Sequence, residues 1–170
     1  MRSLWLLFVS AFLLLSATPS SGLDKTYEAA LDRELWTIIR KQPKYTWGGC
    51  TSEEQGVDCS GFIYLAAKRA ALPVKRVTAK DMANGLGGWF GVSVGLREAN
   101  VLHLVWWTWR DKKPLREHGH IGVVVLGDGS RLLEVAHASQ SKRYVVIQPC
   151  EGKLLTEISA VKRLTIGDKK

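Results

Sequence analysis

The sequence has 170 residues, contains no internal repeat or low-complexity linker, and carries a formal net charge of +8. Such a basic chain suits an anionic surface, for example a cell wall or a membrane face. Nucleic acid is the other partner that this charge would indicate. It is disfavoured because no basic run is interleaved with aromatic residues and because the N-terminus predicts export.

The N-terminus has the pattern of a secretory signal peptide. A basic start is followed by a nearly unbroken apolar run over residues 4–15, and then by small residues up to Gly22. About a dozen apolar residues suit a signal-peptide core and are too few to span a bilayer comfortably. We therefore expect residues 1–22 to be removed near Gly22 or at Ala17-Thr18. Residues 23–170 would then be a single periplasmic or secreted domain without a stable membrane anchor. The alternative is an uncleaved N-terminal anchor.

The first predicted element of the mature chain is an amphipathic helix from Asp24 to Arg40, because apolar residues recur there at i, i+4, i+7 and i+8. Pro43 lies just beyond its end. The next segment, Tyr45-Thr46-Trp47-Gly48-Gly49, has the composition of a short strand that ends in a turn. Residues 51–57 are predicted to form a polar loop.

Cys59 lies at the predicted start of a second helix. After Asp58-Cys59-Ser60-Gly61, apolar residues recur at helical spacing as far as Ala70, and Pro73 is the stop signal. Asp58 occupies the position of an N-cap. A helix N-terminus favours the thiolate over the thiol, so Cys59 is predicted to be a nucleophile with a lowered pKa. The alternative is that Cys59 is a buried core cysteine.

Beyond this helix the pattern changes from helices to strands. Residues 73–97 are glycine-rich, with a short helical segment at 78–84, and form either one wall of a cleft or a surface loop. Strands are predicted over residues 101–109, 120–126, 131–138 and 143–150, and a last one within 154–166. Helices followed by antiparallel strands predict an α+β fold, in which N-terminal helices pack on a central antiparallel sheet.

Two histidines lie on the two strands of a predicted hairpin. His120 opens the first strand and His137 lies near the end of the second, so antiparallel pairing brings them close together. A thiol nucleophile needs a base within hydrogen-bond reach and a third group that orients the base. We expect Cys59, His120 and His137 to form that set, with His120 as the base and His137 fixing its tautomer. His118 points to the same face of an extended segment and is the competing base.

Three cysteines in an exported protein leave one of them unpaired. Cys50 and Cys150 are the expected disulfide, which leaves Cys59 free, although the sequence does not fix this connectivity. A bridge between Cys50 and Cys59 would instead block the nucleophile. A zinc site built from Cys59 and the histidines is disfavoured because the candidate ligands have no compact spacing. Neither a metal nor a cofactor is expected.

The motifs resemble those of the NlpC/P60 family of cysteine peptidases. The matching segments follow the family's order across nearly the whole mature chain, and together they are specific. They are Tyr45-Thr-Trp-Gly-Gly49, Asp58-Cys-Ser-Gly-Phe62, Arg76 with Thr78, Leu104-Val-Trp-Trp107, His120-Ile-Gly122 and His137-Ala-Ser139.

The resemblance implies a papain-like α+β fold and hydrolysis within the peptide stems of bacterial peptidoglycan. The bond usually cut is the one between γ-D-glutamate and the following diamino acid. The same cysteine and two histidines are implied as the catalytic set. Tyr45 resembles the family's active-site tyrosine, close to the oxyanion or the substrate. Asp58 and Ser60 match positions that in some members meet the free amine of the stem's L-alanine.

Two rival functions are compatible with the sequence. One keeps the fold and the catalytic set but cuts between muramic acid and L-alanine, as an N-acetylmuramoyl-L-alanine amidase. The other is a non-catalytic cell-wall-binding module in which Cys59 is merely structural. Peptidoglycan stem peptides are the expected partner of the enzyme, and the sequence does not determine an oligomeric state.

Overall fold

A computed structural model of the chain describes residues 23–110, 114–127 and 133–165, so the predicted signal peptide lies outside the described residues. The elements follow one another along the chain as a group of helices and then a group of strands. They are α1 (Lys25–Lys41), α2 (Cys59–Arg69), α3 (Ala79–Ala83), η1 (Leu86–Gly88), β1 (Gly91–Ser93), η2 (Leu96–Glu98), β2 (Leu104–Trp109), β3 (Arg116–Leu126), β4 (Glu134–Ser139), β5 (Tyr144–Pro149), α4 (Gly152–Thr156) and β6 (Ile158–Leu164).

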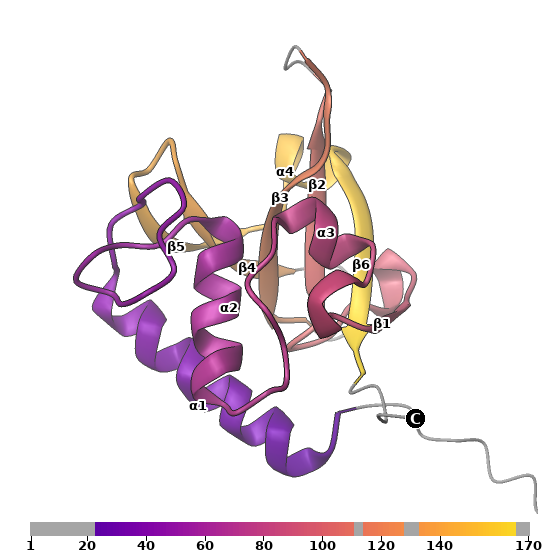
Figure 1. Cartoon of the computed structure of the whole chain (residues 1–170). Coiled ribbons are helices and arrows are strands. Elements are labelled where there is room, and N and C mark those ends of the chain that lie inside the picture. The colour runs from indigo at the N-terminus through magenta and orange to yellow at the C-terminus, as the bar shows by residue number, and fades with distance from the viewer. Residues whose placement is uncertain (1–22, 111–113, 128–132, 166–170) are drawn as a thin grey trace, which may run out of the picture.

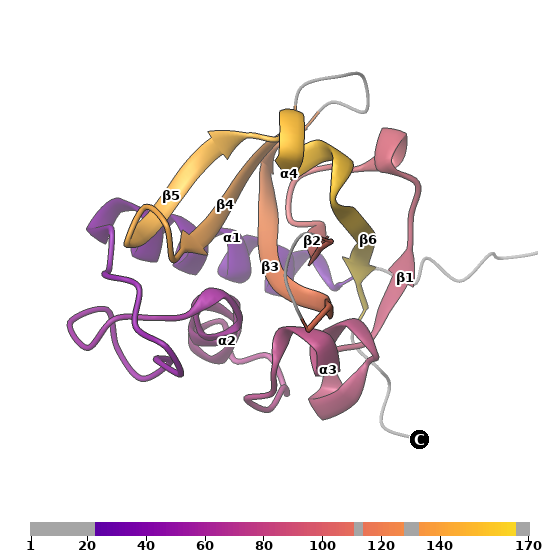
Figure 2. The ribbon, with the colours of Figure 1, turned by 90° about the horizontal axis from the view of Figure 1, so that it is seen from above.

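The strands of the described residues form one six-stranded antiparallel sheet in the order β1-β6-β2-β3-β4-β5. Strands β2 to β5 are neighbours in sequence as well as in space, whereas β6 returns to lie between β1 and β2. Helix α2 packs beside α1 (Figure 1), and α2 and α3 lie on the side of the sheet opposite to α4 (Figure 2). The predicted α+β arrangement is confirmed.

The predicted helices form within one or two residues of their expected bounds. Helix α1 begins after Asp24, whose carboxylate accepts a hydrogen bond from the N–H of Thr26 at 2.7 Å. Helix α3 begins after Thr78, whose hydroxyl accepts from the N–H of Asp81 at 3.2 Å. Side-chain oxygens at both N-caps therefore satisfy backbone donors that have no partner within the helix.

Strand β3 begins earlier than predicted, at Arg116 rather than at His120, because Arg116 pairs with Trp109 of β2. Its charged first residues belong to a part of the strand that is mostly exposed, so no apolar alternation marked them in the sequence. Strand β1 was not predicted. Its three residues pair with the C-terminal strand β6, and the sequence of a glycine-rich segment does not reveal so distant a partner.

The alternation of side chains along the strands separates two apolar clusters. On one face, Ile121 and Val123 of β3 pack with Phe62 and Ile63 of α2. On the other face, Val124 belongs to a cluster with residues of β2, β4 and the segment after β5, namely Val105, Trp107, Val135 and Cys150. Successive residues of a strand point to opposite faces, so the helices cover Ile121 and not its neighbours His120 and Gly122.

A buried carboxylate ties the loop before α2 to the ends of two helices. Glu53 is 6% exposed and accepts two hydrogen bonds from the guanidinium of Arg69, the last residue of α2. Lys41, the last residue of α1, lies 3.4 Å from the same carboxylate. The hydrogen bonds from Arg69 lower the pKa of Glu53 from 4.5 to about 2. The loop that precedes Cys59 is therefore anchored to the helices that flank it.

Replacing Glu53 with glutamine should lower the free energy of unfolding by about 2 kcal/mol at pH 7, because Arg69 would lose its charged acceptor. A lowered pKa stabilises the fold at pH values above the ordinary value of 4.5, and that contribution is lost as the pH falls toward 2. Denaturant unfolding of both proteins at pH 7 and pH 3 measures the effect. The gap between them should narrow at pH 3. The control is Glu54→Gln, which changes an exposed neighbour and should leave stability unchanged.

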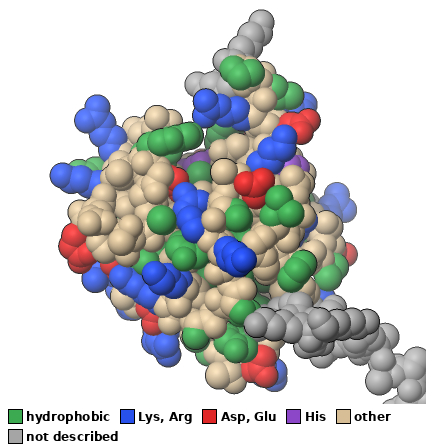
Figure 3. Space-filling view, viewed as in Figure 1, with side chains coloured by type: hydrophobic (Ala, Val, Ile, Leu, Met, Phe, Trp, Pro, Cys, Tyr) green, Lys and Arg blue, Asp and Glu red, His purple; other side chains and the backbone are tan. Residues whose placement is uncertain are grey.

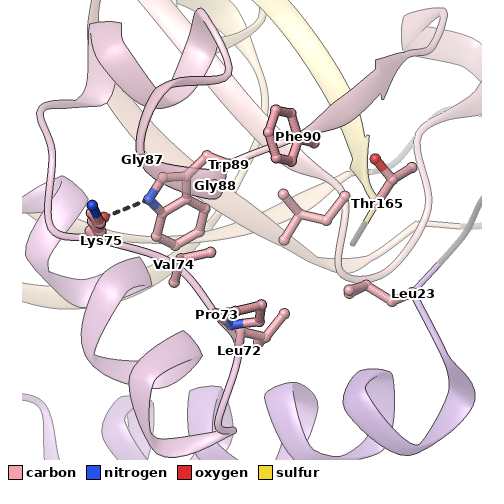
Figure 4. Close-up of a pocket in the computed structure, with 11 residues that line it drawn as sticks. Leu23, Leu72, Pro73, Val74, Lys75, Gly87, Gly88, Trp89, Phe90 and Thr165 are labelled. Carbon is pink, nitrogen blue, oxygen red and sulfur yellow. Dashed lines mark hydrogen bonds between the residues drawn. The ribbon is translucent and has the colours of Figure 1, made fainter. Parts of the chain in front are cut away.

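An apolar cavity of about 380 Å³ lies near the C-terminal end of α2 (Figure 4). Leu72, Pro73 and Val74 line one side of it, and Trp89 and Phe90 line another. The indole N–H of Trp89 donates to the carbonyl of Lys75 at 2.8 Å, which fixes the ring in the wall. Cys59 lies at the other end of α2, about 16 Å away along a helix of eleven residues, so this cavity is separate from the predicted nucleophile.

Basic side chains are distributed over the face of the molecule shown in Figure 3 rather than gathered in one patch. This distribution agrees with the spread of Lys and Arg along the sequence. Among the described residues, no helix is long and apolar enough to cross a membrane.

Candidate active site

Cys59 is the first residue of α2, as the sequence predicts. Asp58 is the N-cap, and its Oδ1 accepts a hydrogen bond from the N–H of Gly61 at 2.5 Å. The side chain of Cys59 is buried, with 8% exposed. The local sequence therefore places the sulfur in the first turn of a helix that packs against the sheet.

Asp58 holds together three parts of the site. Its carboxylate accepts hydrogen bonds from the N–H of Gly48 at 3.0 Å and from the hydroxyl of Ser60 at 3.1 Å. The guanidinium of Arg76 donates to both oxygens, at 2.9 and 2.8 Å. A carboxylate has about four lone-pair sites, and these donors together with Gly61 fill them. Asp58 thus fixes the glycine turn, the helix start and Arg76 relative to one another.

Gly61 allows the turn before α2 to approach the helix closely. A Cβ atom at Gly61 would lie 1.8 Å from the carbonyl oxygen of Gly49. The same carbonyl accepts a hydrogen bond from the N–H of Asp58 at 3.0 Å. Any side chain at position 61 would therefore force apart the turn and the helix that begins with Cys59.

The two predicted histidines meet on the sheet. Nε2 of His120, on β3, lies 2.8 Å from Nδ1 of His137, on β4. Their rings are nearly perpendicular, at 89°, and Trp107 of β2 lies against both of them. This hydrogen bond uses one nitrogen of each ring and leaves Nδ1 of His120 available.

His137 is buried, with 4% exposed, and its Nε2 makes no hydrogen bond of ordinary geometry in the described part of the chain. Burial lowers the pKa of His137, while the nearby side chain of Gln148 raises it. Gln148 and His137 belong to the paired strands β5 and β4 and lie on the same face, because Val135 pairs with Gln148 and His137 with Val146. Gln148 is therefore the polar side chain next to the free nitrogen.

Cys59 meets β3 at the residue that follows His120. The backbone N–H groups of Ile121 and Ser60 reach the sulfur and lower the pKa of the thiol. The sulfur thus lies beside the main chain of β3. The His120 ring, in contrast, lies on the same face of the sheet as Trp107 and contacts it. Within the described residues no hydrogen bond joins the Cys59 sulfur to the His120 ring, so proton transfer between them requires a closer approach.

The pKa of Cys59 is raised to about 11 instead of being lowered as the sequence predicted. Burial has the largest effect, and the negative charge of Asp58 raises the pKa further. The two backbone donors and the charge of Arg76 offset only part of this increase. Burial and the neighbouring His137 also lower the pKa of His120 to about 3. At neutral pH the resting site therefore contains a thiol and a neutral imidazole.

Tyr45 pairs with Val57, two residues before the nucleophile. Burial raises the pKa of its hydroxyl to about 12, and the charges of Cys59 and Asp58 raise it as well. The hydroxyl therefore keeps its proton at neutral pH and remains a hydrogen-bond donor. The Ser60 hydroxyl, by contrast, donates to Asp58 and accepts from Arg76 at 2.8 Å, so it belongs to the Asp58 network.

The structure is similar to several solved structures, among them proteins described as members of the NlpC/P60 family. It matches an NLP/P60-family protein, described as similar to lipoprotein, from Staphylococcus aureus with a TM-score of 0.64 and 15% identity, over 90% of this chain and 46% of that one. It matches the peptidoglycan hydrolase RipB from Mycobacterium tuberculosis with a TM-score of 0.58 and 21% identity, over 84% of this chain and 69% of that one. The chain has the NlpC/P60 fold. The predicted resemblance is thus confirmed at the level of the fold.

The NlpC/P60 fold also occurs in RipD from Mycobacterium tuberculosis, which is described as a non-catalytic NlpC/p60 domain protein adapted to peptidoglycan binding. This chain matches RipD with a TM-score of 0.51 and 16% identity, over 78% of this chain and 95% of that one. No family model matches the sequence, and no curated protein matches it. This chain spans about half the length of the Staphylococcus aureus protein, at 46%.

In this NlpC/P60 fold the three cysteines are free thiols, so the predicted disulfide between Cys50 and Cys150 is wrong. Cys50 lies in the segment between α1 and α2. Cys150 follows the other end of β5 and packs in the cluster behind the sheet. The structure therefore does not join Cys50 and Cys150 in a disulfide.

The other two histidines of the chain lie apart from the His120–His137 pair. His118, the competing base, adopts a positive φ of 49°, and its Nδ1 lies 2.8 Å from the hydroxyl of Ser159 on β6. His103 accepts a hydrogen bond from the N–H of Asn100 at 3.1 Å, which is a structural role away from the site. Among the described residues no cluster of side chains could hold a metal ion.

Three residues of the site had no assigned role in the sequence analysis. Arg76 was part of a matching motif, yet its bond to Asp58 spans 18 residues and could not be read from spacing. Trp107 and Gln148 reach the histidines only because their strands pair with β3 and β4. The one signal in the sequence was the aromatic composition of residues 104–109, which indicates a strand whose side chains could pack against the histidines.

Proposed function

We propose that the chain is an exported thiol hydrolase that cleaves the peptide stems of bacterial peptidoglycan. The observation that carries this proposal is the position of the Cys59 sulfur at the start of α2, beside the residue that follows His120, whose ring is bonded to His137. A nucleophile, a base and an orienting group are the minimum set for acyl transfer by a thiol. The fold shared with the hydrolase RipB supports peptidoglycan as the substrate.

In the proposed mechanism the Cys59 proton moves to Nδ1 of His120 as the sulfur attacks the amide carbonyl. Nδ1 is the ring nitrogen that His137 leaves available, and it is the one nearer the main chain, where the sulfur lies. A Nε2–H of His120 would then donate to Nδ1 of His137. This tautomer leaves a proton on Nε2 of His137, for which Gln148 is the nearest acceptor.

The oxyanion that forms on the substrate carbonyl needs donors already in place. The N–H of Cys59 is at the first position of α2 and has no carbonyl partner within the helix. The Tyr45 hydroxyl is the second proposed donor, because its raised pKa keeps it protonated. The His120 imidazolium then protonates the leaving amine as the C–N bond breaks. It afterwards takes a proton from the water that hydrolyses the thioester, and Cys59 regains its thiol.

The proposed bond is the one between γ-D-glutamate and the following diamino acid, which makes the enzyme a DL-endopeptidase. Asp58 and Ser60 were predicted to meet the free amine of the stem's L-alanine. Because the Asp58 carboxylate is already filled by five donor contacts, its proposed contribution is to hold the turn and Ser60 in place for that amine. The single domain 23–170, removal of residues 1–22 and export remain part of the proposal.

A non-catalytic peptidoglycan-binding module is the second candidate. It is favoured by the neutral state of the resting Cys59 and His120, and RipD offers a precedent for such a function on this fold. An amidase that cuts between muramic acid and L-alanine is the third, because the same catalytic set would serve it.

Mass spectrometry of the products from purified peptidoglycan separates these functions. Residues 23–170 should release stem fragments that begin with the diamino acid and leave L-alanine and D-glutamate on the glycan. Release of intact stems would show the amidase instead. Sedimentation of the protein with the wall, with no product formed, would show the binding module and overturn the proposed hydrolase.

A further inference from the structure

A hollow of about 370 Å³ lies next to the candidate active site and has basic walls. It is lined by Lys44, Tyr45, Gln140, Arg143 and Tyr144. The hollow forms where the segment before α2 crosses the β4–β5 hairpin. There Lys44 and Tyr144 form an antiparallel bridge, and the N–H of Tyr45 donates to the carbonyl of Arg143 at 2.8 Å.

The charges in this hollow are all of one sign. Lys44 and Arg143 are both exposed, and within the described residues neither forms an ion pair. No acidic residue of the described chain lines the hollow; the other lining groups are two tyrosines and a glutamine. Two cations with nearby hydroxyl and amide donors suit an anionic ligand, and the planar fork of arginine suits a carboxylate in particular.

The backbone at Arg143 is strained. Its φ is +69°, in the left-handed region where glycine or asparagine is preferred at a hairpin turn. The conformation is held at both ends, because the N–H of Arg143 donates to the carbonyl of Ser139 at 2.8 Å and its own carbonyl accepts from Tyr45. Glycine would suit this backbone, so the turn itself does not require the basic side chain at position 143.

Tyr45 connects the hollow to the nucleophile. Tyr45 lines the hollow, and its backbone pairs with that of Val57, two residues before Cys59. A peptide whose scissile carbonyl lies against Cys59 therefore has the hollow within reach of the groups beside that bond.

We propose that the Lys44–Arg143 hollow binds a free carboxylate of the peptide whose bond Cys59 attacks. This inference rests on the proposed function and names a substrate feature that the site selects. A glutamate linked through its side-chain carboxyl keeps a free α-carboxylate close to the γ-amide bond, which is the kind of group that the hollow would take. A stem in which this carboxylate is amidated would lose its charged partner.

The test measures the binding of two synthetic stem peptides, one with the free α-carboxylate on D-glutamate and one with the carboxamide. Calorimetry is done in a Cys59→Ala background, so that no peptide is consumed. Arg143→Gly should weaken binding of the free acid about tenfold, since it removes a hydrogen bond to a charged group, and should leave binding of the amide unchanged. Glycine suits the backbone at position 143, so the melting temperature should not fall.

Lys142→Ala is the matched control, because Lys142 is the neighbouring exposed cation and does not line the hollow. It should leave both affinities unchanged. The proposal is overturned if the parent protein binds the two peptides equally, if it binds neither, or if Arg143→Gly weakens both alike. Selective binding through Arg143 by a protein whose parent releases no fragments would reject the hydrolase and leave the hollow's role intact.

Discussion

Replacing Cys59 with alanine is expected to lower the rate of stem-peptide cleavage by about 10³-fold or more, because no other group in the site could form the thioester. Cys59 packs among apolar side chains in the first turn of α2, and alanine removes only one sulfur there. The Asp58 network that holds the turn does not involve the sulfur. The fold should therefore persist, and cleavage of a defined stem peptide measured by liquid chromatography reports the loss.

Cys50→Ala is the control for that experiment, since Cys50 is a free thiol in the turn before α2. It should retain cleavage at the parent rate. Circular dichroism of both variants should match the parent. A Cys59→Ala protein that still releases fragments at the parent rate would reject the assignment of the nucleophile.

The Cys59 thiol is expected to react slowly with iodoacetamide at neutral pH, despite its place at a helix N-terminus. With a pKa of about 11, only about one thiol in 10⁴ is ionised at pH 7. The alkylation rate should rise about tenfold with each pH unit between pH 7 and pH 10, because the thiolate is the reacting species. Peptide mapping by mass spectrometry assigns the modified cysteine.

Unfolding the protein in urea provides the comparison, because an exposed thiol has a pKa near 9. The folded protein should react about 100-fold more slowly than the unfolded one at pH 7, which corresponds to the difference of two pKa units. A rate in the folded protein that levels off below pH 8 would show a stable thiolate and contradict the neutral resting site. In that case the proton would already lie on His120 before the substrate arrives.

The sequence predicted those parts of the site that depend on neighbours along the chain. The N-cap at Asp58, the helix that begins with Cys59 and the pairing of the two histidines all follow from local spacing or from a single hairpin, and the structure has them. The identity of the base was open between two histidines. The contact of His118 with Ser159 of β6 could not be predicted, because it depends on where the C-terminal strand enters the sheet.

The charge states could not be predicted from the sequence because they depend on burial. The lowering of a thiol pKa by a helix N-terminus can be anticipated from the sequence, because the start of the helix can be predicted there. The opposing effect of burial against β3 is set by packing between residues about 60 positions apart. The disulfide prediction failed for a related reason. Counting cysteines gave a pair, but the fold places Cys50 in the segment before α2 and Cys150 in the apolar cluster that contains Trp107, and both are free thiols.

The carboxylate of Asp58 joins the glycine turn, the start of α2 and Arg76 without any contribution from the sulfur that follows it. The scaffold and the reactive atom are therefore separable. One nucleotide change at the Cys59 codon could silence the proposed chemistry while leaving the proposed wall-binding surface intact. A chain that has lost the reactive cysteine could then persist as a protein that only binds its ligand. The forms with and without the cysteine should differ little in stability.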